Sequence, residues 1–295
     1  MSTTSKANKK TRNAIIGLIV VVALVVVSLI VGQVAFGHKN ETPKGNTVIK
    51  VGVTSEADSS IWDAVNDVLK KQGKPITIKL VKFQGGTTQN ADALTSGDID
   101  LSASAHYAFW KNLVDNKGYK ITNLGDTIIN AYNLYSLKHK DVSSIPDGGR
   151  IAVPNNATNA ARAYNVLQQA GLIKLNPANE SLPTKQDITE NPKNLIIDEV
   201  DPNQIPNLLQ DYDAGVTNVF SVIDHGMKPD ENAIYKANLD LNDPFNHQWI
   251  NTIACATKNK DNPLYKDVVD AYHTKEVAET IIKDFKGAYT PAFKY

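Results

Sequence analysis

Apolar runs alternate with amphipathic segments along most of the chain, and this alternation predicts an α/β fold. The β-branched run over 47–54 fits a buried strand, and 59–73 follows it with apolar residues at helical spacing. A strand of period two over 76–83, a helix, turn and strand over 90–104 and a helix closed by Gly118 come next. The order β-α-β-α predicts a mostly parallel sheet with helices on its faces.

A second β/α unit begins at Arg150 and continues through 194–200 and 214–226, and two amphipathic helical stretches end the chain. Two such units predict a two-lobed body, in which ligands bind beyond the carboxyl ends of the strands. The loops expected at the binding cleft are Ser55–Ser59, Gln84–Gln89, Ser104–Tyr107, Asn155–Thr158 and Asn218–Phe220.

The N-terminal segment predicts attachment to a membrane. Residues 14–36 carry no charge, which matches the ~20 apolar residues of a spanning helix. Four cations precede this run, so we expect 1–13 to be a cytoplasmic tail, 37–47 a linker and the rest to lie outside the cell. A signal peptide cleaved after Gly37 is the alternative, although its apolar core would usually span ~7–15 residues.

Charge and cysteine content narrow the classes of function. Residues 13–295 carry 27 basic against 31 acidic side chains, because four of the 31 cations precede them. A net charge of −4 gives no electrostatic reason to expect nucleic-acid binding. The single cysteine, Cys255, lies in an apolar run and is interpreted as a buried small hydrophobic residue, so no intrachain disulfide is expected.

No motif for catalysis or for a cofactor is present. The chain lacks a phosphate-binding glycine loop and a Gly-x-Ser-x-Gly elbow, and its six histidines show no metal-site spacing. We therefore expect no catalytic set, no metal and no cofactor. An enzyme that uses His106 with a carboxylate remains the alternative.

Residues suited to binding gather where predicted strands meet helices. Asn159 and Arg162 lie three apart near a helix N-terminus, where free N–H groups and a guanidinium together favour a carboxylate. His106 and Asn218 follow predicted strands at the same edges. Taken singly, each has an ordinary interpretation, namely an exposed arginine, a helix cap or a turn residue.

Several segments, in order, resemble the NlpA-type lipoproteins, the substrate-binding proteins of methionine ABC importers. They include "IKVGVT", "LTSGDIDLSASAH", "IAVPNNATNAARAYNVLQQAGLIKL", "QIPNLLQDYDAGVTN" and "KGAYTPAF", and the resemblance runs from about Val48 to Phe293. It implies a type II periplasmic-binding-protein fold over 48–295. The first lobe would comprise about 48–137 and 247–295, and the second about 138–246.

The resemblance also implies roles for individual residues. Arg162 would hold an α-carboxylate with Asn159 beside it, Asn218 would contact the polar backbone of the ligand, and His106 would lie beside its side chain. The implied partners are an amino acid or short peptide, an ABC permease and its ATPase.

Three positions depart from the family pattern. No cysteine follows the apolar run, so the span itself would be the anchor. Gly86 or Thr87 stands near a common tyrosine, and Ser104 replaces a phenylalanine. Tyr107, Phe109 and Trp110 are the candidates for compensating rings. We therefore expect weak binding of free methionine and a preference for another amino acid or a short peptide. A surface protein with a vestigial cleft is the remaining alternative.

Overall fold

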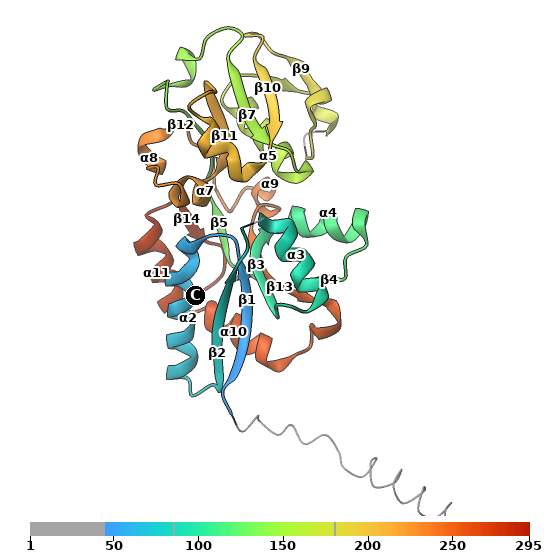
Figure 1. Cartoon of the computed structure of the whole chain (residues 1–295), viewed down its shortest axis with the longest axis vertical. Helices are drawn as coiled ribbons and strands as arrows, with labels where there is room; N and C mark the ends of the chain where they lie inside the picture. Colours follow the sequence, from blue (N-terminus) through green and yellow to red (C-terminus); the bar gives the residue numbers. More distant parts are fainter. Residues whose placement is uncertain (1–44, 85, 180) are drawn as a thin grey trace, which may run out of the picture. The chain divides into compact units, whose positions relative to one another are not determined.

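The computed structural model describes residues 45–84, 86–179 and 181–295, and residues 46–295 form one compact unit. Two five-stranded sheets form the two lobes (Figure 1). In the first lobe the strand order is β2 (Ile76–Lys82), β1 (Thr47–Val53), β3 (Leu101–His106), β13 (Asn251–Ala256) and β4 (Ile121–Asp126). In the second lobe the order is β10 (Ile196–Val200), β7 (Arg150–Pro154), β11 (Ala214–Asn218), β6 (Tyr132–Tyr135) and β12 (Ala233–Tyr235).

Each sheet combines parallel and antiparallel pairs. In the first, β1 pairs in parallel with β2 and β3, whereas β13 is antiparallel to both β3 and β4. In the second, β7 pairs in parallel with β10 and β11, whereas β6 is antiparallel to β11 and β12. The expectation of mostly parallel sheets is therefore only half right. The antiparallel strands β6 and β13 belong to the segments that cross between the lobes, which the β-α-β pattern does not cover.

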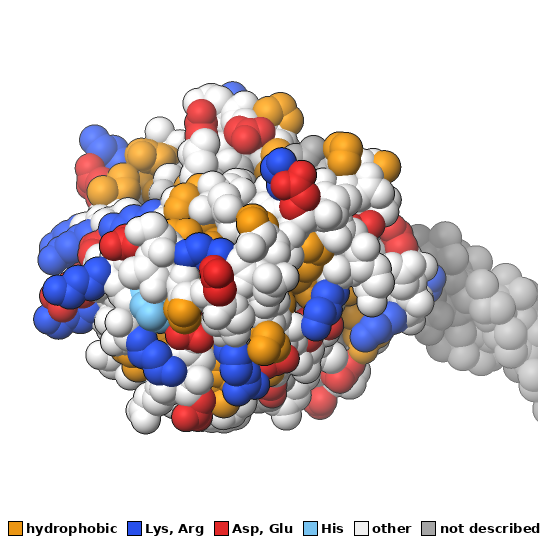
Figure 2. Space-filling model, turned by 90° about the horizontal axis from the view of Figure 1, so that it is seen from above, with side chains coloured by type: hydrophobic (Ala, Val, Ile, Leu, Met, Phe, Trp, Pro, Cys, Tyr) orange, Lys and Arg blue, Asp and Glu red, His pale blue; other side chains and the backbone are white. Residues whose placement is uncertain are grey.

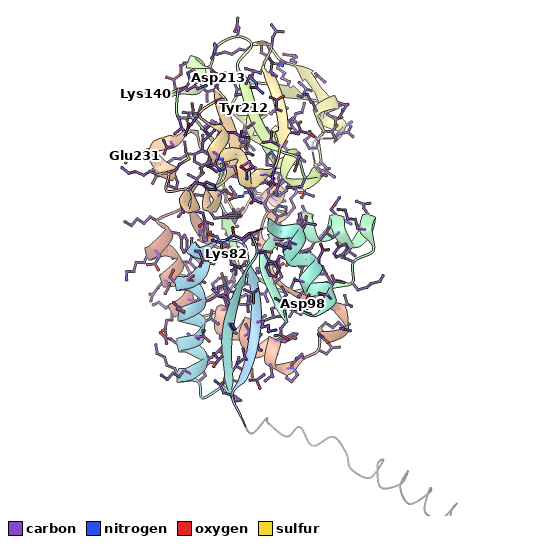
Figure 3. All side chains as sticks on the ribbon, in the orientation of Figure 1. Lys82, Asp98, Lys140, Tyr212, Asp213 and Glu231 are labelled. Atoms are coloured by element: carbon purple, nitrogen blue, oxygen red, sulfur yellow. The ribbon has the colours of Figure 1, made fainter. Side chains whose placement is uncertain are left out.

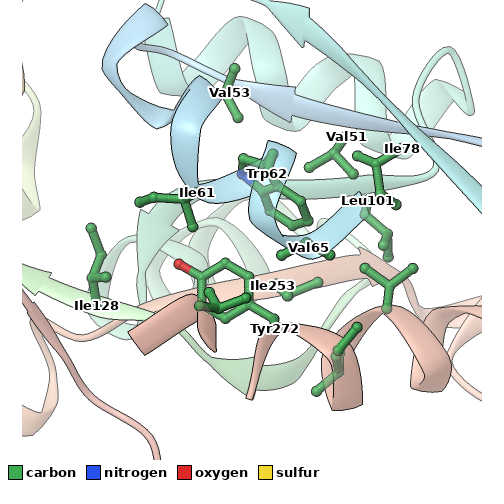
Figure 4. Close-up of a cluster of buried hydrophobic side chains, with 14 of the residues drawn as sticks. Val51, Val53, Ile61, Trp62, Val65, Ile78, Leu101, Ile128, Ile253 and Tyr272 are labelled. Atoms are coloured by element: carbon green, nitrogen blue, oxygen red, sulfur yellow. The ribbon is translucent and has the colours of Figure 1, made fainter. Parts of the chain in front are cut away.

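Helices cover both faces of the first sheet. Trp62 of α2 (Ser59–Lys71), Val268 of α10 (Pro263–Tyr272) and Ile281 of α11 (Lys275–Phe285) belong to the core on one face (Figure 4). The core on the other face contains Leu94 of α3 (Gly86–Ser96) and Trp110 of α4 (Tyr107–Lys117). Neighbouring residues of β13 follow this division, because Ile253 and Cys255 join the first core and Ala254 the second. Cys255 is fully buried, as the sequence predicts.

The second lobe has its own core, in which the long helix α5 (Ala157–Gln169) packs against β6, β7 and β11.

The remaining elements of the two lobes are short. The shorter helices are α6 (Ile205–Leu208), α7 (Val219–Asp224), α8 (Pro229–Asn232) and α9 (Pro244–His247). The 3₁₀ turns are η1 (Glu56–Asp58), η2 (Val142–Ser144), η3 (Pro177–Asn179), η4 (Lys185–Asp187), η5 (Pro202–Gln204) and η6 (Thr257–Asn259). A small antiparallel pair joins β8 (Lys174–Leu175) to β9 (Ile188–Glu190).

The chain crosses between the lobes at two places. It passes from β5 (Ile128–Asn130) into β6, and it returns from β12 through α9 into β13. The last strand, β14 (Tyr289–Pro291), pairs with β5 at the first crossing. The expected boundary near 137 would assign β6 to the first lobe. Because β6 belongs to the second sheet, the boundary lies before that strand.

The predicted membrane span over 14–36 lies outside the described residues. Among the residues that the structure does describe, no helix has both the length and the apolar character needed to cross a bilayer.

Gly52 of β1 has no room for a side chain, because α3 and the turn that follows it lie close to its backbone. An ideal Cβ on Gly52 would lie 2.5 Å from Ile99 Cδ1 and 2.6 Å from Asn90 Nδ2, and both side chains are buried. We predict that Gly52→Ala lowers the free energy of unfolding by about 1–3 kcal/mol, because the core must shift to admit a methyl group. Urea denaturation measures this change. Gly45→Ala is the control, since nothing lies within 4 Å of its Cβ, and equal stability of the two variants would refute the prediction.

Candidate functional site

A cavity of about 200 Å³ lies between the two lobes and is lined by residues of both. Ser104 and His106 reach it from the carboxyl end of β3, Asn156 from the end of β7 and Asn218 from the end of β11. Figure 3 labels Lys82 at the carboxyl end of β2, on the side of the first lobe nearest the second. The cavity therefore lies where the strand-end rule predicts a ligand site.

Arg162 is the cation of this cavity, and it is buried. Its side chain is only 5% exposed, and Nη2 donates a hydrogen bond of 2.9 Å to the backbone oxygen of Asn130. The guanidinium carbon lies 4.6 Å from the ring centre of Tyr132 and 5.3 Å from that of Trp249. Burial lowers the pKa of Arg162 to about 10, so the group stays charged at neutral pH.

No carboxylate of the described chain forms an ion pair with Arg162. Aromatic faces and one carbonyl oxygen offset only part of the cost of burying a charge. The interpretation of Arg162 as an ordinary exposed helix residue is therefore wrong. The buried guanidinium is suited to receive an anion from outside the chain.

His106 connects the two lobes beside this arginine. Its Nδ1 accepts the backbone N–H of Phe109 at 3.1 Å, so Nε2 carries the proton and donates to Asn159 Oδ1 at 3.0 Å. Burial, and then the nearby charge of Arg162, lower the pKa of His106 to about 3. The ring is thus neutral, and it both caps α4 and holds a polar side chain of α5 in place.

The two asparagines expected to bind ligand also cap or brace helices. Asn218 caps α7 by accepting the N–H of Ser221 at 2.8 Å, and it lines the cavity. Asn159 donates its own N–H to Asn156, the cap of α5, at 3.1 Å. Thr158, in the first turn of the same helix, is buried. Asn218 and His106 are therefore helix caps and also line the cavity.

The remaining expected residues divide between the cavity and its surroundings. Ser104 and Thr87 line the cavity, and Ser104 Oγ lies 3.1 Å from Ser102 Oγ. Tyr107 does not line it: its hydroxyl donates to Asp126 at 2.6 Å, and its ring stacks on His247. His106, the cap of α4, lines the cavity, whereas Tyr107, the first residue of that helix, lines the neighbouring groove.

Other lining residues escape the sequence analysis. Phe220, which belongs to an expected loop, and Phe109, an expected candidate for a compensating ring, both line the cavity, whereas the following residues were not expected there. Asn130 and Tyr132 come from the crossing between the lobes, and Asn203 comes from η5. Their positions depend on how the lobes meet, for which the sequence pattern has no signal.

Among the lining residues that the structure describes, Arg162 is the only Lys or Arg and Asp201 the only Asp or Glu. The described residues contain no group of three or more His, Cys, Asp or Glu side chains that could hold a metal ion. On the face of the molecule seen in Figure 2, cationic and anionic side chains lie among one another rather than in a patch of one sign.

The chain is similar to known proteins over most of its length. The family model described as NlpA lipoprotein matches residues 49–293. The probable D-methionine-binding lipoprotein MetQ of Pasteurella multocida is 35% identical over 239 residues, which are 81% of this chain and 84% of that protein.

Two solved structures share the two-lobed fold. A nutrient-binding protein of Burkholderia cenocepacia, bound to methionine, has a TM-score of 0.75 and 36% identity and covers 83% of this chain and 100% of its own. The substrate-binding protein of a methionine transporter from Streptococcus pneumoniae has a TM-score of 0.76 and 34% identity, with coverage of 83% and 95%.

The neutrality of His106 predicts a pH dependence of stability. Its pKa is about 3 in the folded protein and near 6.5 in the unfolded chain, so between these values only the unfolded chain binds the proton. The free energy of unfolding should therefore fall with decreasing pH, with a slope of up to about 1.4 kcal/mol per pH unit from this group. Urea titrations from about pH 7 to about pH 5 measure the slope for wild type and for His106→Gln. Equal slopes in the two proteins would contradict the assignment.

Proposed function

This chain belongs to the NlpA lipoprotein family, and we propose on that premise that it is the methionine-binding component of an ABC importer. The observation that carries the proposal is the buried Arg162 in the cavity between the lobes, which pairs with no carboxylate in the described parts of the chain. A free amino acid brings one carboxylate, which suits one guanidinium. The permease and ATPase of the importer are the partners that this function requires.

The proposed binding mode places the α-carboxylate of the ligand on Arg162. Asn159 and Asn218 would then lie beside the backbone of the ligand, and His106 beside its side chain. The cavity volume of about 200 Å³ is below the roughly 300–1,000 Å³ of pockets for drug-sized ligands. This size favours a single amino acid over a peptide.

We also propose that the span over 14–36 anchors the protein in the membrane, with the binding domain outside the cell. The family consists of lipoproteins, but the chain has a single cysteine, Cys255, which is fully buried in β13. A lipid cannot be attached to a residue in the core of the folded domain. The uncharged N-terminal run therefore remains as the means of attachment.

Truncating Arg162 should strongly weaken the binding of methionine. We expect Arg162→Ala to cost about 2–5 kcal/mol of binding free energy, because a buried carboxylate would lose its charged partner. Arg162→Lys should also bind more weakly, since an ammonium cannot reproduce the two-pronged contact. Titration calorimetry measures both.

The matched control is Arg150→Ala. Arg150 is half-exposed and pairs with Asp198 and with Tyr212, which Figure 3 labels in the second lobe. It should bind methionine like wild type. If Arg162→Ala, with an unchanged circular dichroism spectrum, also binds methionine like wild type, the carboxylate clamp is wrong.

Membrane attachment should persist without lipid. N-terminal sequencing of the protein recovered from membranes should find residues upstream of Gly37 still present, and Cys255→Ala should remain in the membrane fraction. Recovery of only a soluble form that begins near His38 would show that the segment is a cleaved signal peptide.

A further inference from the structure

The wall of the cavity carries many uncharged polar side chains beside its aromatic rings, which are those of Phe109, Tyr132 and Phe220. Seven asparagines line it, among them Asn130, Asn203 and Asn251, together with three threonines and Ser104. The described lining residues include no Val, Leu, Ile or Met. Most ligand pockets are instead lined mainly by apolar side chains with a few polar groups.

Part of this polar wall is not needed for the α-carboxylate and the backbone of the ligand. Asn203 comes from η5 of the second lobe and faces Gly86 at the start of α3 in the first. An ideal Cβ on Gly86 would lie 3.2 Å from Asn203 Nδ2, so the amide occupies the space that a side chain at this position would take. Ser104 and Thr87 also line the cavity, and Ser104 is only 8% exposed.

These groups both donate and accept hydrogen bonds, and they carry no net charge. A thioether cannot satisfy them, whereas a carboxamide offers two donors and an acceptor. A second carboxylate on the ligand would find Arg162 already in use and Asp201 repelling it. A cationic side chain would share the cavity with the guanidinium of Arg162.

We infer that the ligands of this cavity include amino acids with a neutral, hydrogen-bonding side chain about as long as that of methionine, such as glutamine. Asn203, Ser104 and Thr87 are the residues that determine this selectivity. The inference rests on the proposed function, because it assumes that Arg162 holds the α-carboxylate in both cases. It deepens that function by adding a chemical class of ligand.

Titration calorimetry on the full chain in detergent tests the inference with four ligands: methionine, norleucine, glutamine and glutamate. We expect glutamine to bind no more than tenfold weaker than methionine, norleucine to bind no tighter than methionine, and glutamate to bind at least tenfold weaker than glutamine, because Asp201 lines the cavity and Arg162 already holds the α-carboxylate.

Two substitutions assign the selectivity to residues. Asn203→Leu keeps the size of the side chain but removes its amide, and Ser104→Ala removes one hydroxyl. Each should raise the ratio of the glutamine to the methionine dissociation constant by about tenfold, the effect of losing one hydrogen bond. Asn207→Leu is the control, because Asn207 is exposed on α6 nearby and should leave this ratio unchanged.

The outcomes separate the inference from the function on which it rests. Methionine binding with glutamine more than tenfold weaker overturns the inference and leaves the proposed function intact. An unchanged ratio in both Asn203→Leu and Ser104→Ala overturns the assignment to these residues. Failure of all four amino acids to bind wild-type protein overturns the proposed function itself.

Discussion

Arg162 is a buried guanidinium with no anionic partner among the described residues, and the rest of the cavity depends on this constraint. Arg162 lies in the second turn of α5, where the helix dipole is mildly unfavourable for a cation, and it is almost fully buried. The protein surrounds it with groups that tolerate a positive charge: a backbone carbonyl, two aromatic faces and a neutral histidine. If His106 were protonated, two cations would share one buried site. Burial is the main cause of the low pKa of that ring, and the charge of Arg162 lowers the pKa further.

The two-lobed architecture explains how this charge can be buried and still accept a ligand. Arg162 belongs to the second lobe, but its hydrogen bond goes to β5 at the crossing, and Trp249 precedes β13 of the first lobe. Two further hydrogen bonds join the lobes directly, from His106 to Asn159 at 3.0 Å and from Ser55 to Asp224 at 2.9 Å. An arrangement with the lobes apart would break these bonds and open the cavity to water. In the proposed binding mode, ligand binding and contact between the lobes depend on the same side chains.

The sequence predicts the parts of this site that depend on local pattern. Strands and helices with clear periodicity are found close to their expected limits, and four of the five expected loops contribute lining residues. Ser55–Ser59 does not line the cavity, and Ser55 instead joins the lobes. What the sequence could not predict depends on contacts between distant segments. The antiparallel strands β6 and β13, the ring of Tyr132 and the amide of Asn203 reach their places only when the crossings bring the lobes together.

The two sides of the cavity differ in the same way, because one depends on local pattern and the other on contacts between distant segments. The side around Arg162 comes from strand-to-helix junctions, and in the proposed binding mode it depends on one charge. The side formed by Asn203, Gly86 and Ser104 is assembled from both lobes, and single substitutions there change polarity without touching the charged anchor. Such a division allows one scaffold to keep its hold on the amino-acid backbone while the preferred side chain changes. The preference for a neutral polar ligand side chain over an apolar one depends on the amides and hydroxyls of the wall. The more of them that lack a hydrogen-bond partner when the apolar side chain binds, the stronger the preference.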